Sequence, residues 1–259
     1  MTLAHPAYGQ LRQVTPTAAV LLADNPGKMT LDGTNTWILR APGSDDVVVV
    51  DPGPKDKKHL DAVAASGTVV LVLVTHRHGD HTGGLKRFHK KTGAPIRAFS
   101  DEFVYGSTAL VDGEVIEAAG LKITVLATPG HTADSSSFVL DDAILTGDTI
   151  LGRGTTVLDP KDGTLADYLA SLDRLEAAGA GKIALPGHGA EVADTAEIAR
   201  MYRKHRLERL EQIKAALAVL GEDAKPMKVV KHVYADVDKK LWPAARMSVK
   251  AQLTYLRES

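Results

Sequence analysis

The sequence predicts an α/β layered fold followed by a small helical domain, and three observations support this. Short β-branched and apolar runs alternate with segments of helical composition, which is typical of sheets covered by helices. From about Ala193 onward the pattern is almost wholly helical. With 259 residues, 44% of them hydrophobic, the chain is long enough to bury a large core.

The predicted strands of the first half are apolar runs bounded by turn-forming residues. Pro-Gly, Asp-Asp and Asp51-Pro-Gly-Pro sequences separate them, and the segment Lys57–Ala65 has helical composition. The strands expected here are Thr36–Leu39, Val47–Val50 and Val69–Val74.

The second half repeats this pattern. A hairpin turn is expected at Asp141-Asp142, between two short strands. The segment Leu165–Ala178 carries apolar side chains three or four positions apart, which predicts an amphipathic helix. The strands expected here are Ile96–Phe99, Lys122–Leu126, Ser137–Leu140, Ala143–Leu145 and Lys182–Leu185.

The C-terminal region predicts three helices in succession. A leucine-rich stripe that stops at Gly221 indicates the first of them. The three expected segments are Leu207–Leu220, Pro226–Tyr234 and Pro243–Leu256. We therefore expect a catalytic domain over residues 1–195 and a helical domain over residues 196–259.

Composition narrows the classes of function. The longest apolar runs have the length of strands, so no membrane span is expected, and the segment Met1–Gln10 lacks the pattern of a secretory signal. A cytoplasmic location is therefore expected. The chain has no cysteine, so any metal site must use nitrogen and oxygen ligands. The net charge is −1 overall but +6 from Arg203 to the end. This excess predicts an acidic partner for the tail, unless the cations only solvate helix faces.

The segment that indicates chemistry is Thr75-His76-Arg77-His78-Gly79-Asp80-His81, directly after the last strand of the first half. Loops that follow strands commonly carry reactive groups in α/β folds. Imidazole and carboxylate groups are suitable ligands for zinc and similar divalent ions. Alternation along an extended loop places His76 and His78 on one side, while Asp80 and His81 can serve a neighbouring position.

Three further turns each place one potential ligand just beyond a predicted strand, beside a glycine. They supply His131, Asp148 and His188. A single histidine would more often be a surface or hydrogen-bonded core residue, but four converging strand ends predict a site for two metals. The histidines without this context are expected to be non-ligands: His5, His59, His89, His205 and His232.

These motifs resemble the metallo-β-lactamase superfamily in order and spacing, over roughly residues 14–192. The resemblance implies a four-layer αβ/βα sandwich with the site at one edge of the sheets. The implied ligands are His76, His78 and His131 for the first metal, Asp80, His81 and His188 for the second, and Asp148 bridging both. It also implies that Asp51 braces the metal loop without binding metal; the alternative is a simple turn former.

Two metals held in this way predict a hydrolase. Zinc is the expected metal, with manganese or iron as alternatives, and a shared water would lose a proton near neutral pH to give a bridging hydroxide. Asp80 is the predicted catalytic residue, which orients this nucleophile and takes part in moving its proton. A purely structural site is disfavoured, because such sites are closed and rich in cysteine.

A second resemblance extends over nearly the whole chain. The segments 33–37 and 147–156, together with those around Tyr234 and Trp242, are similar to the lactamase-beta-like 2 group, whose members carry a C-terminal winged-helix-like domain. The sequence stops at Ser259, where such a domain would continue into its β-hairpin wing. We therefore expect a wingless helical tail, and its alternative roles are to cover the cleft or to form a homodimer contact.

That group includes endoribonucleases that act on single-stranded RNA and thioesterases that release acyl products. The basic tail favours RNA, and Arg153 is predicted to contact a substrate phosphate or carboxylate, with a structural salt bridge as the alternative. Only 12 of 259 residues are aromatic, which weakens the case for base stacking. An endoribonuclease is the first expectation and a thioesterase of the glyoxalase II type is the alternative. The third hypothesis is a non-catalytic nucleic-acid-binding protein with structural metals.

Overall fold

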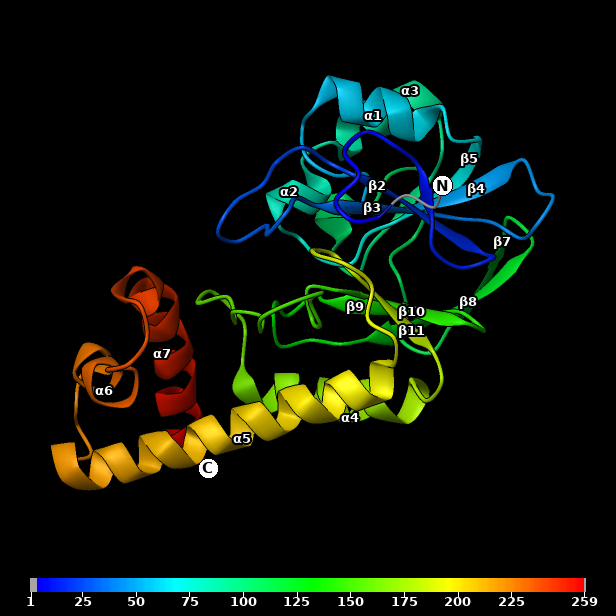
Figure 1. Ribbon diagram of the computed structural model, residues 1–259. Helices are drawn as coiled ribbons and strands as arrows, with labels where there is room; N and C mark the ends of the chain where they lie inside the picture. Colours follow the sequence, from blue (N-terminus) through cyan, green and yellow to red (C-terminus); the bar gives the residue numbers. More distant parts are fainter. Residues whose placement is uncertain (1–3, 259) are drawn as a thin grey trace.

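The computed structural model describes residues 4–258, which form two stacked β-sheets between two helical layers, with a helical domain beside them (Figure 1). This is the four-layer αβ/βα sandwich that the sequence predicts. The segment Met1–Gln10, in which no secretory signal is expected, includes residues 1–3, which lie outside the described residues. Across residues 4–258, no helix combines the length and apolar character that crossing a bilayer requires.

The first sheet contains six strands that follow one another in chain order. The first four strands pair in antiparallel fashion, and the fourth, fifth and sixth pair in parallel. They are β1 (Arg12–Gln13), β2 (Ala18–Leu22), β3 (Asn35–Leu39), β4 (Asp46–Val50), β5 (Thr68–Leu73) and β6 (Ile96–Arg97).

The second sheet contains five strands in the order β11-β10-β9-β8-β7, of which β10 and β11 run in parallel. The predicted hairpin joins β9 to β10 at Asp141-Asp142, where the Leu140 amide donates to the Ala143 carbonyl at 2.8 Å. The strands are β7 (Val115–Ala118), β8 (Leu121–Ala127), β9 (Ser136–Val139), β10 (Ala143–Gly147) and β11 (Ile183–Pro186).

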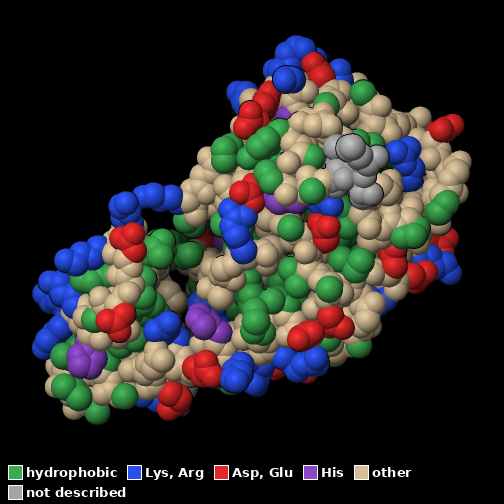
Figure 2. Space-filling view, viewed as in Figure 1, with side chains coloured by type: hydrophobic (Ala, Val, Ile, Leu, Met, Phe, Trp, Pro, Cys, Tyr) green, Lys and Arg blue, Asp and Glu red, His purple; other side chains and the backbone are tan. Residues whose placement is uncertain are grey.

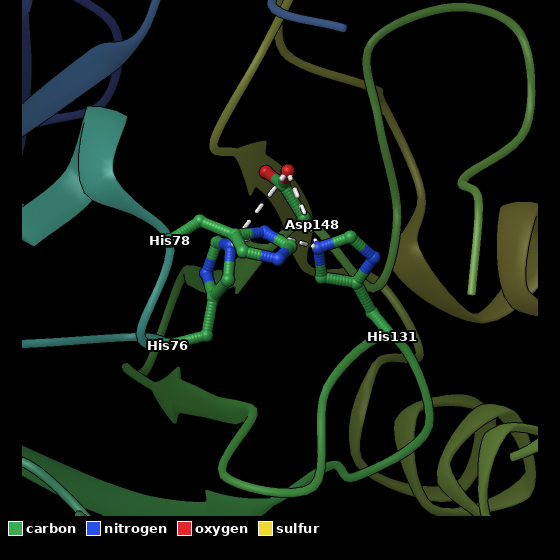
Figure 3. Close-up of side chains that lie close together, drawn as sticks. All are labelled: His76, His78, His131 and Asp148. Atoms are coloured by element: carbon green, nitrogen blue, oxygen red, sulfur yellow. Dashed lines mark hydrogen bonds and ion pairs between the residues drawn. The ribbon is translucent and has the colours of Figure 1, made fainter. Parts of the chain in front are cut away.

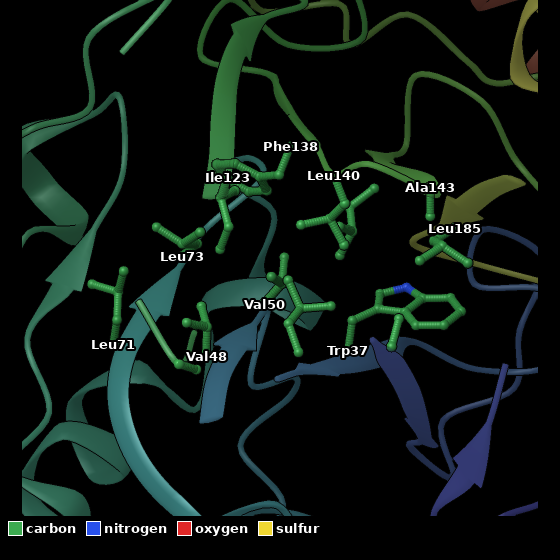
Figure 4. Close-up of a cluster of buried hydrophobic side chains, with 14 of the residues drawn as sticks. Trp37, Val48, Val50, Leu71, Leu73, Ile123, Phe138, Leu140, Ala143 and Leu185 are labelled. Atoms are coloured by element: carbon green, nitrogen blue, oxygen red, sulfur yellow. The ribbon is translucent and has the colours of Figure 1, made fainter. Parts of the chain in front are cut away.

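The core lies between the two sheets and on their outer faces. Side chains of β4 alternate, so that Val48 and Val50 pack between the sheets near Trp37, as Figure 4 shows, while Val47 and Val49 face the outer helices. A strand covered on both sides requires apolar residues at successive positions, which explains the uninterrupted valine run.

Two pairs of helices cover the outer faces of the sheets (Figure 1). Helices α1 (Lys57–Ala64) and α3 (Leu85–Thr92) pack on the first sheet, and α4 (Leu165–Ala178) and α5 (Thr195–Leu220) pack on the second. Sequence analysis missed α3, because only Leu85 and Phe88 of its eight residues are buried and the others are mostly basic. Two short helices, α2 (Gly79–Thr82) and the 3₁₀ helix η1 (Asp101–Phe103), lie within loops.

Helix α5 extends beyond the sandwich and joins it to the helical domain. Its first half packs on α4 through Ala199 and Tyr202, whereas its second half packs on the last two helices through Ile213 and Ala216. The remaining elements are α6 (Pro226–Val233), the 3₁₀ helix η2 (Lys239–Leu241) and α7 (Trp242–Glu258). The domain boundary expected after residue 195 falls at the start of this continuous helix and stays a prediction.

Candidate metal centre

The segment 75–81, which we call the metal loop, follows β5 and is anchored by the turn that follows β4. Asp51 lies beneath this loop: the Thr75 amide donates to Asp51 Oδ1 at 2.8 Å and the Thr75 hydroxyl donates to Oδ2 at 2.6 Å. His81 Nδ1 also lies 2.8 Å from Asp51 Oδ2. The backbone of Asp51 has a φ of 51°, which is uncommon for a residue other than glycine and is held here by these contacts.

The structure brings all seven predicted ligands together, four from the metal loop and three from turns of the second sheet. Figure 3 shows the three histidines and one aspartate that converge on the first position. In each group, one ligand atom per residue lies within 4.8 Å of the others. The two groups are His76, His78, His131 and Asp148, and Asp80, His81 and His188.

Asp148 lies between the two groups and is positioned to serve both. Its Oδ2 is 3.7 Å from His131 Nε2 and 3.3 Å from His188 Nε2, while its Oδ1 is 3.6 Å from His81 Nε2. Asp51 also lies within ligand distance of two histidines, but its oxygens are already engaged by the metal loop.

Each of the five histidines uses one ring nitrogen to contact an oxygen outside the cluster. These oxygens are carbonyls and carboxylates, which only accept, or the Thr75 hydroxyl, which already donates to Asp51. The outward nitrogens therefore carry the protons. The pairs are His76 Nδ1 with Thr75 Oγ1 (3.0 Å), His78 Nε2 with Asp159 Oδ2 (2.7 Å), His81 Nδ1 with Asp51 Oδ2 (2.8 Å), His131 Nδ1 with the Val157 carbonyl (2.6 Å) and His188 Nδ1 with the Gly33 carbonyl (2.9 Å).

In the first group, the inward nitrogens of the three histidines then present lone pairs to one another at short distances. His78 Nδ1 lies 3.0 Å from His76 Nε2 and 3.1 Å from His131 Nε2. Asp148 Oδ1 is buried without a hydrogen-bond partner. Converging lone pairs and a buried carboxylate cannot satisfy each other, and they require a cation between them. The donor set therefore fits two divalent cations.

Burial and nearby charge shift the pKa values of the histidines in the site in opposite directions. Burial lowers the pKa of His76 well below its usual range and also lowers that of His131, which keeps both neutral. Burial opposes a charge on His188 as well, but Asp148 and Asp80 outweigh it and raise its pKa to about 9. Burial likewise opposes the charge on both aspartates, but their histidine neighbours hold both pKa values well below the usual range. A cation that binds at His188 must therefore displace a proton.

The segment 156–159 forms hydrogen bonds to two of the predicted ligands, His78 and His131, although neither Val157 nor Asp159 was predicted to do so. The Val157 carbonyl accepts from His131, and the Asp159 carboxylate accepts from His78. Such outer contacts fix which ring nitrogen faces the metal. Asp159 stands before a proline in a loop, 81 positions after its histidine partner, so no spacing rule could have indicated the contact.

Two arginines hold this segment in place. Arg206, a buried residue of α5, donates to the Thr156 carbonyl. Arg77 Nη2 lies 3.0 Å from Asp159 Oδ2 and 2.9 Å from Asp162 Oδ1. Helix α5, which leads to the helical domain, is thus connected to the backbone beside two of the predicted ligands.

Asp80 and Arg153 differ in their surroundings. The side chain of Asp80 is 25% exposed, and its Oδ2 accepts from the Thr34 hydroxyl at 2.9 Å. Arg153 donates to both oxygens of Asp32, which is the structural salt bridge considered as the alternative. About half of the Arg153 side chain remains exposed, and its contact with substrate stays a prediction. In the described part of the chain, the five histidines expected to be non-ligands belong to none of the potential metal groups.

Comparisons with protein families match two parts of the chain. A family described as the metallo-beta-lactamase superfamily matches residues 29–188, and one described as the beta-lactamase associated winged helix domain matches residues 226–259. The second match covers α6, η2 and α7, and all regular elements of residues 226–258 are helical.

Individual proteins agree with these matches. An atrochrysone carboxyl ACP thioesterase of Aspergillus terreus is 32% identical over 199 residues, which are 73% of this chain and 59% of that protein. The chain thus spans about three fifths of that relative's length. A metallo-beta-lactamase family protein from Thermus thermophilus has a TM-score of 0.75 at 24% identity, with 94% of each chain covered. A beta-lactamase domain protein from Burkholderia ambifaria has a TM-score of 0.80 at 21% identity, covering 98% of this chain and 90% of that one. These two structures support the fold alone.

Proposed function

The chain belongs to the metallo-beta-lactamase superfamily, and on that premise we propose that it is a metal-dependent hydrolase of acyl thioesters. The observation that carries the hydrolase assignment is the pair of neighbouring ligand groups, with the Asp148 carboxylate of the first group lying close to two histidines of the second. The thioester assignment is supported by a relative named as an acyl carrier protein thioesterase. Both the thioesterase and the endoribonuclease hypotheses require a metal-dependent hydrolase, whereas the non-catalytic hypothesis does not.

We assign the cations to the residues whose inward atoms converge. His76, His78 and His131 would hold the first, His81, His188 and Asp80 the second, and Asp148 would contact both. When bound, divalent cations of this kind polarise a substrate carbonyl and make a water molecule more acidic. Zinc is the expected metal, and manganese and iron suit the same nitrogen and oxygen donors.

The residues of the chain itself orient the reaction. Asp80 stays ionised because its pKa is held low, so its carboxylate acts as a hydrogen-bond acceptor that can align a nucleophilic water. Thr34 fixes this carboxylate by donating to Oδ2. The partial exposure of Asp80 leaves it accessible from the solvent side of the site, where a substrate would arrive.

Single-stranded RNA was the first expectation from sequence, and the comparisons favour the thioesterase alternative. That expectation rested on the basic tail, whose charge is equally suited to other anionic groups. No comparison supports RNA or a homodimer. An RNA phosphodiesterase is therefore kept only as an outcome of the test.

The test measures thiol release from an acyl-N-acetylcysteamine thioester by the zinc-loaded protein. We expect hydrolysis that EDTA abolishes and that Asp80→Asn reduces at least about 100-fold, because an amide cannot accept the same hydrogen bonds as a carboxylate. His232→Gln is the matched control, since His232 is exposed on α6 and outside both ligand groups.

A parallel reaction with labelled single-stranded RNA separates the two substrate classes. Metal-dependent cleavage of RNA, with thioesters left intact, would overturn the thioesterase proposal. Full thioester hydrolysis by the metal-free protein would overturn the assigned role of the ligand groups.

A further inference from the structure

Two adjoining cavities lie along α7, between this helix and the segment 158–166. Their volumes are about 260 Å³ and 430 Å³. They share walls formed by Pro160, Met247, Lys250 and Thr254, so they form one elongated depression, which we call the α7 groove. Figure 2 shows the surface hollowed between the helical domain and the sandwich.

One end of the α7 groove lies beside the segment that braces the proposed metal centre from outside. Asp159 lines the first cavity, and its carboxylate accepts from His78 at 2.7 Å. Gly163 lines the same cavity and packs against the backbone of the turn that carries His131; a Cβ added at Gly163 would lie 2.7 Å from the His131 carbonyl oxygen. This end is therefore separated from predicted metal ligands by a single layer of side chains.

The other end of the α7 groove is cationic. The second cavity adds Arg246 and Arg257 to Lys250. Arg246 and Lys250 are exposed, and neither forms an ion pair within residues 4–258. The nearest anionic walls belong to the first cavity, where Asp159 is already paired with Arg77 and Glu258 lies at the end of α7.

Apart from Lys250, which lines both cavities, the middle of the α7 groove is largely apolar. Met247 and Thr254 line both cavities, Leu158 and Ala251 line the first, and Leu253 lines the second. A ligand that fits this arrangement is elongated, with its reacting group at one end, a neutral middle and an anion at the other end. These features match the 4′-phosphopantetheine arm on which biological acyl thioesters are carried.

We propose that the α7 groove binds this arm of an acyl thioester substrate, with the phosphate against Arg246 and Lys250 and the thioester directed toward the metal centre. The inference rests on the proposed thioesterase function. It also accounts for part of the net charge of +6 in the C-terminal region, because three of those cations line the groove. Coenzyme A and acyl carrier proteins both present the arm, so the shared chemistry is the phosphorylated pantetheine.

The first test is calorimetric titration of metal-free, full-length protein with 4′-phosphopantetheine and with pantetheine, which lacks the phosphate. We expect phosphopantetheine to bind about tenfold more tightly, and we expect this advantage to fall as salt is raised. In the double variant Arg246→Gln/Lys250→Gln the two ligands should bind equally. The double variant Lys231→Gln/Lys240→Gln removes the same charge from exposed positions outside the groove and should keep the advantage.

The second test compares one acyl group on three carriers with the metal-loaded protein: N-acetylcysteamine, coenzyme A and a phosphopantetheinylated carrier protein. The groove variant should lose about tenfold in kcat/KM with the phosphorylated carriers and nothing with N-acetylcysteamine. A loss of kcat/KM with both coenzyme A and the carrier protein would show that the groove recognises the arm itself. A loss with the carrier protein alone would show that the arm is recognised when a carrier protein presents it. Either result supports the inference.

Two results would overturn the inference. One is equal binding of phosphopantetheine and pantetheine by the unaltered protein. The other is salt-sensitive binding of single-stranded RNA, but not of phosphopantetheine, that the groove variant loses. Failure of the proposed function is distinguishable, since it appears as no hydrolysis of any thioester, including the one without phosphate.

Discussion

Replacement of Asp159 by alanine is the most direct test of how the chain sets its metal ligands. Among residues 4–258, Asp159 Oδ2 is the one hydrogen-bond partner of the outward nitrogen of His78, at 2.7 Å. Without it, the imidazole can turn or move its proton to the nitrogen that faces the metal. His131 keeps its backbone partner, the Val157 carbonyl, so one of three histidines loses its orientation.

The expected magnitude follows from this count. Loss of one such outer contact lowers metal affinity about 10- to 100-fold, which corresponds to about 1.4–2.7 kcal/mol. Asp159→Asn should have a smaller effect, because an amide oxygen can still accept from His78. Affinity would be measured by competition between metal-free protein and a chromophoric zinc chelator.

Asp162→Ala is the matched control for this experiment. Asp162 and Asp159 both pair with Arg77, at 2.9 Å and 3.0 Å, but only Asp159 contacts His78. Asp162→Ala should therefore change zinc affinity less than about threefold. Equal losses in the two alanine variants would refute the reasoning, since they would assign the effect to the Arg77 ion pairs.

Three further predictions concern a buried histidine of α1 and the protons and space of the metal centre. Burial lowers the pKa of His59 to about 4, so its contribution to stability is complete above about pH 6.5 and is lost as pH falls toward 4. The contribution of His59 amounts to about 3 kcal/mol. In urea titrations, the free energy of unfolding should therefore differ less between pH 7.5 and pH 4.5 in His59→Gln than in the unaltered protein, and an equal difference would contradict the prediction. Zinc affinity should fall about tenfold per pH unit below pH 9, because the raised pKa of His188 means that a proton must leave; a chelator competition series that is flat with pH would exclude this. Gly187→Ala should abolish binding at one or both positions, because the added Cβ would lie 2.4 Å from Asp148 Oδ1; metal analysis of the folded variant that gives the unaltered stoichiometry would contradict it.

Most of the strands and the convergence of the seven predicted ligands could be predicted because each depends on local pattern. Every predicted ligand follows a strand within a few residues, and strand ends on one side of a sandwich meet in space. The valine run of β4 was visible because burial on both faces requires successive apolar residues, and the stripe of α4 because burial on one face imposes the helical period.

The features that escaped prediction depend on contacts between distant segments. Helix α3 buries two side chains, which is too few to produce a periodic signal. Asp159 and Arg206 act on ligands from other elements, through contacts that sequence spacing does not encode. Strands β1, β2 and β7 were also missed: β1 has only two residues, β2 begins with two alanines, and β7 contains only two β-branched residues. The partner of Arg153, Asp32, lies 121 positions away.

The continuity of α5 has a mechanical consequence. A helix of 26 residues is about 39 Å long and behaves as a stiff rod over that length. The first half of this rod carries Tyr202 and Arg206, which donate to the carbonyls of Gly154 and Thr156. Its other end carries the helices that form one wall of the α7 groove. Because the helix is stiff, a displacement of that wall should also move the backbone beside His131. A molecule bound in the groove should therefore change the orientation of a predicted metal ligand that it does not contact.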